Sequence, residues 1–388
     1  MSGSFLSHPH KNADCNAVGI FIYIPPRKEE ACICLKSTQG NQKLLHIFSL
    51  FFDDLPLRFD IRNTSCGDRN FREAIIAEWE SGEKYVIKLA DNDFTFAKKI
   101  EMWKKCAEAY RNCGYYCPAI LCSKKGDFPT VSYKSHRCVA YAEEYHKYHE
   151  AKERFGEACG ESAISEDEIR KETFLMTEKI AAKRLDFADY PSAYCLFDTF
   201  CPSDATDEVL ENALEWKKYA ATLPSEFQAQ IQRIWHRWND NREKLQKIYA
   251  DLPTSIFQAD LNLTNVLLDD NGNFVGIFDF NLCGKDVFLN YLFREIHWHP
   301  TDEAERKYIL ETLKSVTKVY CFSDIEKQAA PLLYRCIKPL WFTRVKKLKE
   351  AGENKKDIKA CLDRIEEMQT KVIDCESYMN ATHILFYT

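Results

Sequence analysis

The sequence lacks several features that would place it in common functional classes. It contains no apolar run as long as a membrane span, which needs about 20 residues, and its formal net charge of −6 gives no basic excess. Binding to nucleic-acid phosphates needs clustered Lys and Arg. We therefore expect no membrane segment and no nucleic-acid partner. With no internal repeat and 388 residues, the chain is expected to fold as two lobes with one cleft.

A secretion signal is also lacking. The apolar run at residues 17–24 is short and has none of the flanking residues of a signal peptide. The 17 cysteines are therefore expected to be reduced thiols in a cytoplasmic protein, packed mostly as small apolar groups. The spacing of Cys113, Cys117 and Cys122 fits no common zinc module.

What the sequence does contain is a strong hairpin pattern between residues 258 and 281. Two apolar, β-prone runs, at 266–268 and 274–278, flank an Asp-rich turn that includes Asn271-Gly272. An Asn-Gly pair between two such runs is typical of a tight β-hairpin turn. We expect the chain to fold back there and to bring the two ends of the hairpin together.

Three oxygen-bearing side chains are placed at one end of this hairpin. Asp260 and Asn265 lie on the loop before it, and Asp279 closes its second strand. Phosphoryl transfer from a nucleotide needs a carboxylate to orient a hydroxyl, and an amide and a carboxylate to hold Mg²⁺ on the phosphates. We predict a kinase site with Asp260 as catalytic base and Asn265 and Asp279 as metal ligands. Asp269 and Asp270 are expected to be solvated turn residues.

An upstream strand supplies a candidate phosphate-binding cation. Residues 85–89 read Tyr-Val-Ile-Lys-Leu, a β-prone run that resembles the nucleotide-binding lysine strand of kinases. An exposed lysine on an edge strand is the alternative for Lys88. A buried ammonium needs a partner, and apolar residues at helical spacing in 96–110 predict an amphipathic helix beside it. Glu101 is the expected ion-pair partner, Glu108 is the second choice, and an ordinary solvated glutamate is the alternative.

Together these segments resemble the aminoglycoside phosphotransferase/choline kinase family, small-molecule kinases with a protein-kinase-like fold. In that family a loop of the form H-x-D-x-x-x-x-N precedes a hairpin that ends in a metal-binding Asp. Asp260, Asn265 and Asp279 match these positions. The sequence departs at Gln258, where the family has His, and at Asn281, where Gly is common. The loop His packs against and hydrogen-bonds the loop backbone, so Gln258 bears on loop rigidity more than on chemistry.

The resemblance implies a bilobal α+β fold. It comprises a small antiparallel β-sheet N-lobe with one main helix and a large, mostly helical C-lobe that contains the catalytic hairpin. We expect an N-terminal extension of uncertain structure at 1–54, a nucleotide-binding N-lobe at 55–145 and a catalytic and acceptor-binding C-lobe at 146–388. For residues 1–54 three interpretations stay open: an extension packed on the small lobe, a poorly ordered leader, and an artefact of start-site choice.

The resemblance also implies further nucleotide-binding residues. The polar stretch at 65–70 would form a flap over the phosphates, although it has no G-x-G-x-x-G motif. The strand at 139–145 would lead into the hinge that reads the adenine edge. The candidate contacts are Ser65 and Gly67 in the flap and Glu143, Glu144 and Tyr145 in the hinge.

The predicted function is transfer of the γ-phosphoryl group of ATP, or of GTP, to a small-molecule hydroxyl with Mg²⁺ as cofactor. Aminoglycoside-, choline- and amino-sugar-like acceptors suit the family, and the acidic balance suits a cationic one. Only residues 282–287 separate Asn281 from the next helical pattern, which is too short for the peptide platform of a protein kinase. The alternatives are a nucleotide-binding pseudokinase or scaffold without turnover, and a kinase acting on a protein side chain. The sequence leaves the oligomeric state open.

Overall fold

The chain divides into two compact units. Unit 1 runs from the N-terminus to Ala163 and takes in Leu261–Asn281, and unit 2 comprises Ile164–Asp260 and Leu282–Thr388. Among the helices that the structure describes, none is long and apolar enough to cross a bilayer. The structure is a computed structural model that describes residues 39–65, 70–156, 165–296, 301–354, 357–371 and 373–380.

Unit 1 is built on a six-stranded antiparallel sheet. Its strands run in the order β1-β2-β3-β6-β4, and β5 pairs with β6. The register pairs Lys88 of β3 with Tyr141 of β6. Because alternate residues of a strand face opposite sides, Lys88 and Glu143 share one face and Ile87 and Ala142 share the other. The strands are β1 (Arg58–Asn63), β2 (Phe71–Glu78), β3 (Lys84–Asp91), β4 (Ile120–Leu121), β5 (Thr130–Tyr133) and β6 (His136–Glu144).

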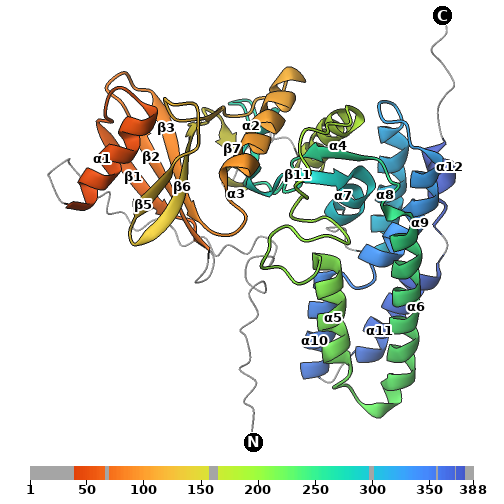
Figure 1. Cartoon of the computed structure of the whole chain (residues 1–388). Coiled ribbons are helices and arrows are strands. Elements are labelled where there is room, and N and C mark those ends of the chain that lie inside the picture. The colour runs from red at the N-terminus through yellow and green to blue at the C-terminus, as the bar shows by residue number, and fades with distance from the viewer. Residues whose placement is uncertain are drawn as a thin grey trace, which may run out of the picture. The chain divides into compact units, whose positions relative to one another are not determined.

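Helix α1 (Gln39–Phe51) covers the sheet face that carries Ile87 (Figure 1). Leu44, Ile47 and Phe48 of this helix belong to one buried core with sheet residues that include Ile75, Ala77, Ile87 and Leu89. Residues 39–51 of the predicted N-terminal extension are thus a helix packed on the sheet. Residues 1–38 lie outside the described residues.

The remaining elements of unit 1 include the predicted hairpin. Strand β9 pairs with β10 on one side and with β7 on the other. Asp269 is confirmed as a turn residue, because its side chain accepts hydrogen bonds from the backbone N–H groups of Asn271 at 2.9 Å and Asn273 at 2.8 Å. The elements are α2 (Ala97–Asn112), β7 (His149–Glu150), α3 (Ala151–Gly156), β9 (Val266–Leu268), β10 (Phe274–Ile277) and a 3₁₀ turn that begins in unit 1 (Phe280–Leu282).

Gly276 lets the segment after α2 approach strand β10 closely, in a parallel bridge between Tyr116 and Gly276. The backbone N–H of Tyr116 donates to the Val275 carbonyl at 2.8 Å, and the N–H of Ile277 donates to the Tyr116 carbonyl at 3.0 Å. A Cβ at residue 276 would overlap the Tyr116 backbone. The close approach therefore requires glycine, and it ties the hairpin to the segment that follows α2.

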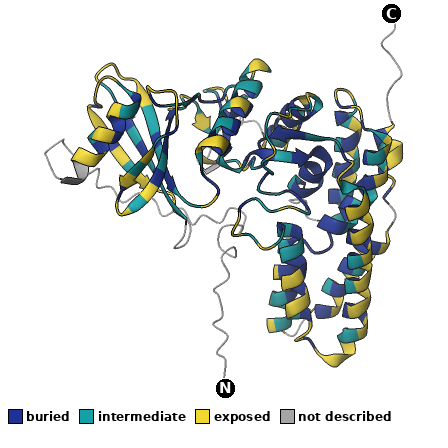
Figure 2. Ribbon diagram, in the orientation of Figure 1, coloured by how far each residue is buried: buried dark blue, intermediate teal, exposed yellow. Residues whose placement is uncertain are grey.

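Unit 2 is mostly helical and contains one two-stranded sheet, in which β8 pairs with β11. Figure 2 shows its long helix α6 buried along one side and exposed along the other. The helices are α4 (Glu166–Ala182), α5 (Glu208–Ala220), α6 (Ser225–Tyr249), α7 (Phe288–Glu295), α8 (Asp302–Val316), α9 (Asp324–Ile337), α10 (Phe342–Glu353), α11 (Ile358–Thr370) and α12 (Cys375–Met379), and the strands are β8 (Thr254–Phe257) and β11 (Gly284–Val287).

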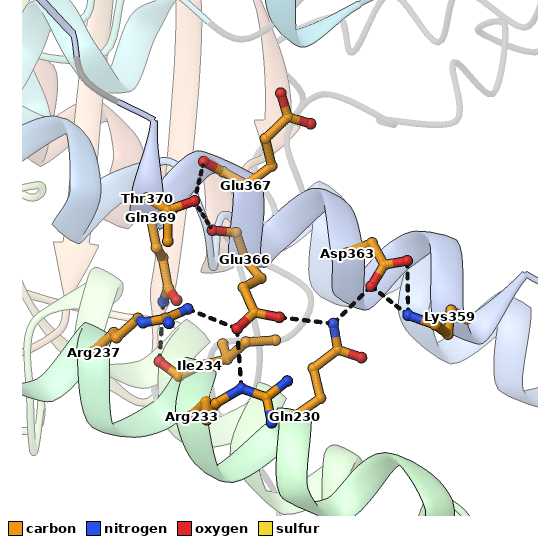
Figure 3. Close-up of polar contacts among 10 residues, drawn as sticks. All are labelled: Gln230, Arg233, Ile234, Arg237, Lys359, Asp363, Glu366, Glu367, Gln369 and Thr370. Atoms are coloured by element: carbon orange, nitrogen blue, oxygen red, sulfur yellow. Dashed lines mark hydrogen bonds and ion pairs between the residues drawn. The ribbon is translucent and has the colours of Figure 1, made fainter.

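A polar network joins α6 to α11 (Figure 3). Arg233 and Arg237 both contact Oε1 of Glu366, at 3.2 and 2.6 Å, and Nε2 of Gln230 donates to Glu366 at 2.9 Å and to Asp363 at 2.8 Å. Burial raises the pKa of Glu366, but these donors lower it more, so the net pKa lies below its ordinary value. The network therefore contributes stability at neutral pH, and this contribution is lost as the pH falls through the folded-state pKa of Glu366.

The predicted α+β class is confirmed. The N-terminal part carries the antiparallel sheet and the C-terminal part is mostly helical. The hairpin residues Leu261–Asn281 are counted with unit 1 in the division into compact units. The domain limits expected at residues 54 and 145 stay predictions.

The first prediction concerns the close approach of the Tyr116 segment to Gly276. Gly276→Ala should lower the free energy of unfolding by about 3 kcal/mol, the upper end of overpacking costs, because the new Cβ meets fixed backbone. Thermal and urea unfolding measure the change. Gly82→Ala is the control: Gly82 has φ +83° and no neighbour within 4 Å of an added Cβ, so it should cost only about 1 kcal/mol of backbone strain. Equal losses of unfolding free energy in the two variants would contradict the close approach at Gly276.

Candidate active site

Unit 1 places Lys88 between two carboxylates. Its Nζ lies 2.8 Å from Oδ1 of Asp279 and 2.9 Å from Oε2 of Glu143. Glu143 reaches Lys88 because the β3–β6 register puts both on one sheet face. Asp279 comes from the chain just after β10, which is 191 positions further along the sequence. The structure thus brings together three of the predicted site residues.

The charges of this cluster stabilise one another. Burial by itself lowers the pKa of Lys88, but the Asp279 and Glu143 carboxylates more than offset this, so the pKa lies well above its ordinary value. Burial raises the pKa of Asp279, but the Lys88 ammonium brings the net pKa below its usual range. Burial dominates at Glu143 and raises its pKa. At neutral pH Lys88 is therefore a cation and Asp279 an anion.

The predicted ion pair between Lys88 and Glu101 is wrong. The Glu101 side chain is 46% exposed, and it pairs with Lys105 at 3.9 Å. Helix α2 turns other residues inward, among them Ile100, Met102 and Trp103. Within the described residues the carboxylates paired with Lys88 come from β6 and from the end of the hairpin, so the second choice, Glu108, is not its partner either.

The hairpin brings Asn265 and Asp279 to the same end. Val266 pairs with Ile277, and the backbone N–H of Phe278 donates to the Asn265 carbonyl at 3.0 Å. Asp279 follows directly and has φ 60°, a left-handed conformation that is uncommon for a residue with a Cβ. Such strain is concentrated at functional sites. The role of these two residues as metal ligands stays a prediction.

The donor chemistry at this end fits a magnesium ion that is shared with phosphates. Asn265 and Asp279 offer an amide oxygen and a carboxylate, and proteins commonly bind Mg²⁺ with one or two carboxylates, water and substrate phosphates. Across the described residues no group of three or more His, Cys, Asp or Glu side chains could hold a metal ion.

The predicted hinge residues have different surroundings. The side chain of Glu143 contacts Lys88, Oε2 of Glu144 accepts from the N–H of Ala119 at 3.0 Å, and the N–H of Tyr145 donates to the Lys84 carbonyl at 3.2 Å. A pocket of about 270 Å³ lies beside Glu144 and Tyr145. Lys88 does not line this pocket. The residues of β3 that do line it are Lys84 and Tyr85, at the beginning of the strand. The other residues that line it are Glu83, Tyr116 and Lys147.

The predicted flap is described only at its base. Oγ of Ser65 donates to the Arg72 carbonyl at 3.2 Å and accepts from the Arg72 N–H at 3.0 Å, which ties together the start and end of the β1–β2 connection. Gly67 lies outside the described residues. The phosphate-binding roles of Ser65 and Gly67 stay predictions.

Two aromatic residues beside the cluster were not predicted from the sequence. The ring centroids of His146 and Phe278 lie 4.7 Å apart, and His146 stacks on Tyr145 at 5.1 Å. Burial lowers the pKa of His146. Adjacency in the sequence could have indicated both, since His146 follows Tyr145 and Phe278 precedes Asp279.

Unit 2 contains the predicted catalytic residue, Asp260, on the loop after β8. Gln258 is fully buried, and its Oε1 accepts from the backbone N–H of Asp260 at 3.3 Å. Gln258 therefore hydrogen-bonds the loop backbone, which is the part that the resemblance implies for histidine. The catalytic role of Asp260 stays a prediction.

Arg294 was also missed, and it lies against the same loop. Its guanidinium donates to the carbonyl of Ala259, pairs with Glu295 at 2.7 Å, and lies 3.4 Å from the centroid of the Tyr194 ring. Arg294 is on α7 and Tyr194 is in the connection before α5. No local pattern links either residue to Asp260, because only the fold of unit 2 brings these segments together.

Carboxylates collect around Tyr194 in unit 2. Burial raises the pKa of Tyr194, and the negative charges of Asp260, Glu208 and Glu295 raise it further, while Arg294 opposes them. Burial also raises the pKa of Glu208, to about 7. Asp260, Glu208 and Glu295 therefore place negative charge around Tyr194, and the Arg294 guanidinium offsets part of it.

The family follows from the match of this chain over residues 69–290 to the phosphotransferase enzyme family. The chain belongs to this family. The match covers more than half of the sequence and includes Lys88, Asp260, Asn265 and Asp279. The predicted recognition, and with it the prediction of a small-molecule phosphotransferase, is confirmed.

Several solved structures resemble this phosphotransferase at low identity. An aminoglycoside phosphotransferase from Alicyclobacillus acidocaldarius is 10% identical, with a TM-score of 0.44 over 86% of this chain and 93% of that one. A microcompartment-associated aminopropanol kinase is 13% identical, with 0.47 over 87% and 97%. A choline/ethanolamine kinase family protein from Mesorhizobium loti is 13% identical, with 0.36 over 83% and 92%. Similarities of this size say nothing about the acceptor. Comparison with curated proteins finds no match.

The second prediction tests the surroundings of Lys88 without reference to activity. Glu143→Gln should speed acylation of Lys88 by an amine-reactive reagent, by about tenfold for each unit that the Lys88 pKa falls, because only the neutral amine reacts. Peptide mass spectrometry measures the rate at a fixed, mildly alkaline pH. Glu101→Gln is the control and should leave the rate unchanged, since Glu101 pairs with Lys105. A larger effect from Glu101→Gln would restore the original assignment.

Proposed function

We propose that this phosphotransferase moves the γ-phosphoryl group of ATP to a hydroxyl of a small molecule. Lys88 would contact the phosphates, Asn265 and Asp279 would hold Mg²⁺, and Asp260 would act as catalytic base. The observation that carries the proposal is the 2.8 Å contact between Lys88 and Asp279. It joins the predicted phosphate-binding cation to the predicted metal-binding carboxylate, from distant parts of the sequence, inside unit 1.

The charge states in unit 1 support this division of roles. Lys88 keeps its proton, so it offers a permanent positive charge to phosphate oxygens, and Asp279 stays ionised as a metal ligand must. When bound, Mg²⁺ would neutralise charge on the phosphates. The phosphates would also compete with Asp279 and Glu143 for the Lys88 ammonium. The rings of His146 and Phe278 offer apolar surface nearby for a nucleotide base, and this surface does not distinguish ATP from GTP.

Asp260 would accept a hydrogen bond from the acceptor hydroxyl and orient it for attack. An ionised carboxylate on a fixed loop suits this role, because general-base catalysis depends on position first and on pKa second. The hydrogen bond to Gln258 fixes the backbone of Asp260. This supports turnover over a pseudokinase or scaffold.

The carboxylates around Tyr194, Asp260 among them, favour an acceptor that carries a positive charge. Glu208 and Glu295 both act on the Tyr194 ring beside Asp260. A cationic amine would offset their mutual repulsion. Aminoglycoside-, choline- and amino-sugar-like alcohols share this chemistry. Every cysteine in the described part of the chain is a free thiol, which suits the cytoplasmic location that we propose for the reaction.

A coupled assay decides the proposal. Purified protein with Mg²⁺ and ATP, or GTP, is tested for ADP or GDP release with kanamycin, choline, ethanolamine and glucosamine, and mass spectrometry identifies the phosphorylated product. Glucose, an alcohol without an amine, is the matched neutral acceptor. We expect at least one amine to raise release above the rate without acceptor, and glucose to leave that rate unchanged. Nucleotide binding without turnover on any acceptor would favour the scaffold alternative.

The third prediction concerns Asp260. Asp260→Ala should lower kcat by roughly 10²–10⁴-fold, the usual contribution of a positioned acid–base group, and should leave ATP affinity nearly unchanged. Steady-state kinetics and calorimetric ATP titration measure the two quantities. Asp251→Ala removes an exposed carboxylate elsewhere in unit 2 and should change neither. Full activity of Asp260→Ala would reject the assignment.

The fourth prediction concerns the metal. Mg²⁺ should strengthen ATP binding to the wild-type protein, and Asp279→Asn should abolish that gain because it removes the charged ligand. Fluorescent-nucleotide titrations with Mg²⁺ and with EDTA measure the difference. Asp270→Asn, which changes an exposed carboxylate on the turn of the same hairpin, should keep the full gain. A gain that survives in Asp279→Asn would place the metal elsewhere.

A further inference from the structure

Arg294 is a buried cation that the proposed chemistry does not use. Only 7% of its surface is exposed, although arginine is seldom buried without a specific role. Its guanidinium donates to the Ala259 carbonyl, and Ala259 is the residue immediately before Asp260. One face of the guanidinium lies on the Tyr194 ring at 3.4 Å, and Glu295 at 2.7 Å offsets part of its charge.

Helix α7 holds two separate segments through one of its faces. Asn290 and Arg294 are four residues apart and therefore neighbours on the helix surface. Asn290 donates to the Tyr194 carbonyl at 2.7 Å, and it also contacts Asp286 at 3.1 Å. Asn290 thus fixes the backbone of Tyr194, whose ring supports Arg294. Arg294 in turn reaches the loop that carries Asp260.

We propose that Arg294 is a positioning residue for Asp260. This rests on the proposed function, in which Asp260 orients the acceptor hydroxyl. Gln258 binds the N–H of Asp260 and Arg294 binds the carbonyl of Ala259. The peptide group that joins Ala259 to Asp260 is therefore held at both its carbonyl and its N–H. A misplacement of 1 Å at a reacting group can cost about 10²-fold in rate, so this restraint bears directly on turnover.

The guanidinium also acts on Asp260 through its charge. Asp260 is among the carboxylates that raise the pKa of Arg294 above its ordinary value, against the opposing effect of burial. The interaction is mutual, so Arg294 favours the ionised form of Asp260. Glu208, Glu295 and Tyr194 also act on the Arg294 guanidinium. When ionised, Glu208 and Glu295 disfavour the ionised form of Asp260. Arg294 therefore opposes the effect of these negative charges on Asp260.

Two substitutions separate position from charge. Arg294→Lys keeps the charge but loses the planar fork that stacks on Tyr194 while it binds the carbonyl. Arg294→Gln keeps a donor and loses the charge. The control is Arg344→Lys, because Arg344 has the same 7% exposure in unit 2 and binds Asp302 at 2.8 Å, on α8.

Three measurements on the full chain test the proposal. ADP release from Mg·ATP, without added acceptor, is followed across pH, the dissociation constant of a fluorescent ATP analogue is titrated, and amide hydrogen exchange is measured for peptides that cover residues 254–261. Arg294→Lys should lower ADP release by roughly 10–100-fold, keep nucleotide affinity, and speed exchange in this segment more than in α6. Arg294→Gln should also move the acid limb of the pH profile upward by about one unit. Arg344→Lys should move none of these readouts.

Each outcome decides. Exchange at 254–261 that is no faster in Arg294→Lys than in Arg344→Lys overturns the proposal, and so does unchanged ADP release with faster exchange. Faster exchange together with slower release and the pH shift in Arg294→Gln supports it. Wild-type protein that binds the analogue but releases no ADP, even with the acceptors tested above, contradicts the proposed function instead. The exchange measurement then still shows whether Arg294 holds the loop.

Discussion

A partly buried ammonium at Lys88 is the constraint on which unit 1 depends. Such a charge is stable inside a protein only when carboxylates offset the loss of hydration. The sheet supplies Glu143 through strand register, and the hairpin supplies Asp279 through its turn. Backbone hydrogen bonds join the Tyr116 segment to the hairpin at Gly276. The β3–β6 register, the hairpin turn and the Tyr116 contact therefore act together to place two carboxylates at one cation.

Unit 2 solves a related problem with neutral and charged donors together. Asp286 is buried, and it accepts from Ser192 at 2.6 Å and from Asn290, which in turn fixes Tyr194. Buried polar groups are tolerated when hydrogen bonds offset the loss of water. This network joins β11, α7 and the connection before α5. The loop that carries Asp260 rests on it through Arg294, so the proposed catalytic carboxylate inherits its position from residues that are distant in sequence.

Local patterns explain what could be predicted from the sequence. The hairpin and the Lys88 strand depend on neighbouring residues, and both appear in the structure. The partner of Lys88 depends instead on how α2 is rotated against the sheet, which helical periodicity does not fix, and Glu101 points away. Strand β11 has no β-prone run, and its Gly284 allows a close approach of Pro191 that no local rule foresees. Long-range packing decides both.

Helix α1 has a consequence for the apolar face beneath it. Leu44, Ile47 and Phe48 shield the outer side of the strand that bears Lys88 on its inner side. If the chain were shortened to begin at residue 55, the side chains of Phe59, Ile75 and Ile87 would become exposed to solvent. They would then form an apolar surface that favours self-association. Helix α1 thus contributes to the solubility of this lobe by covering the apolar face of its sheet.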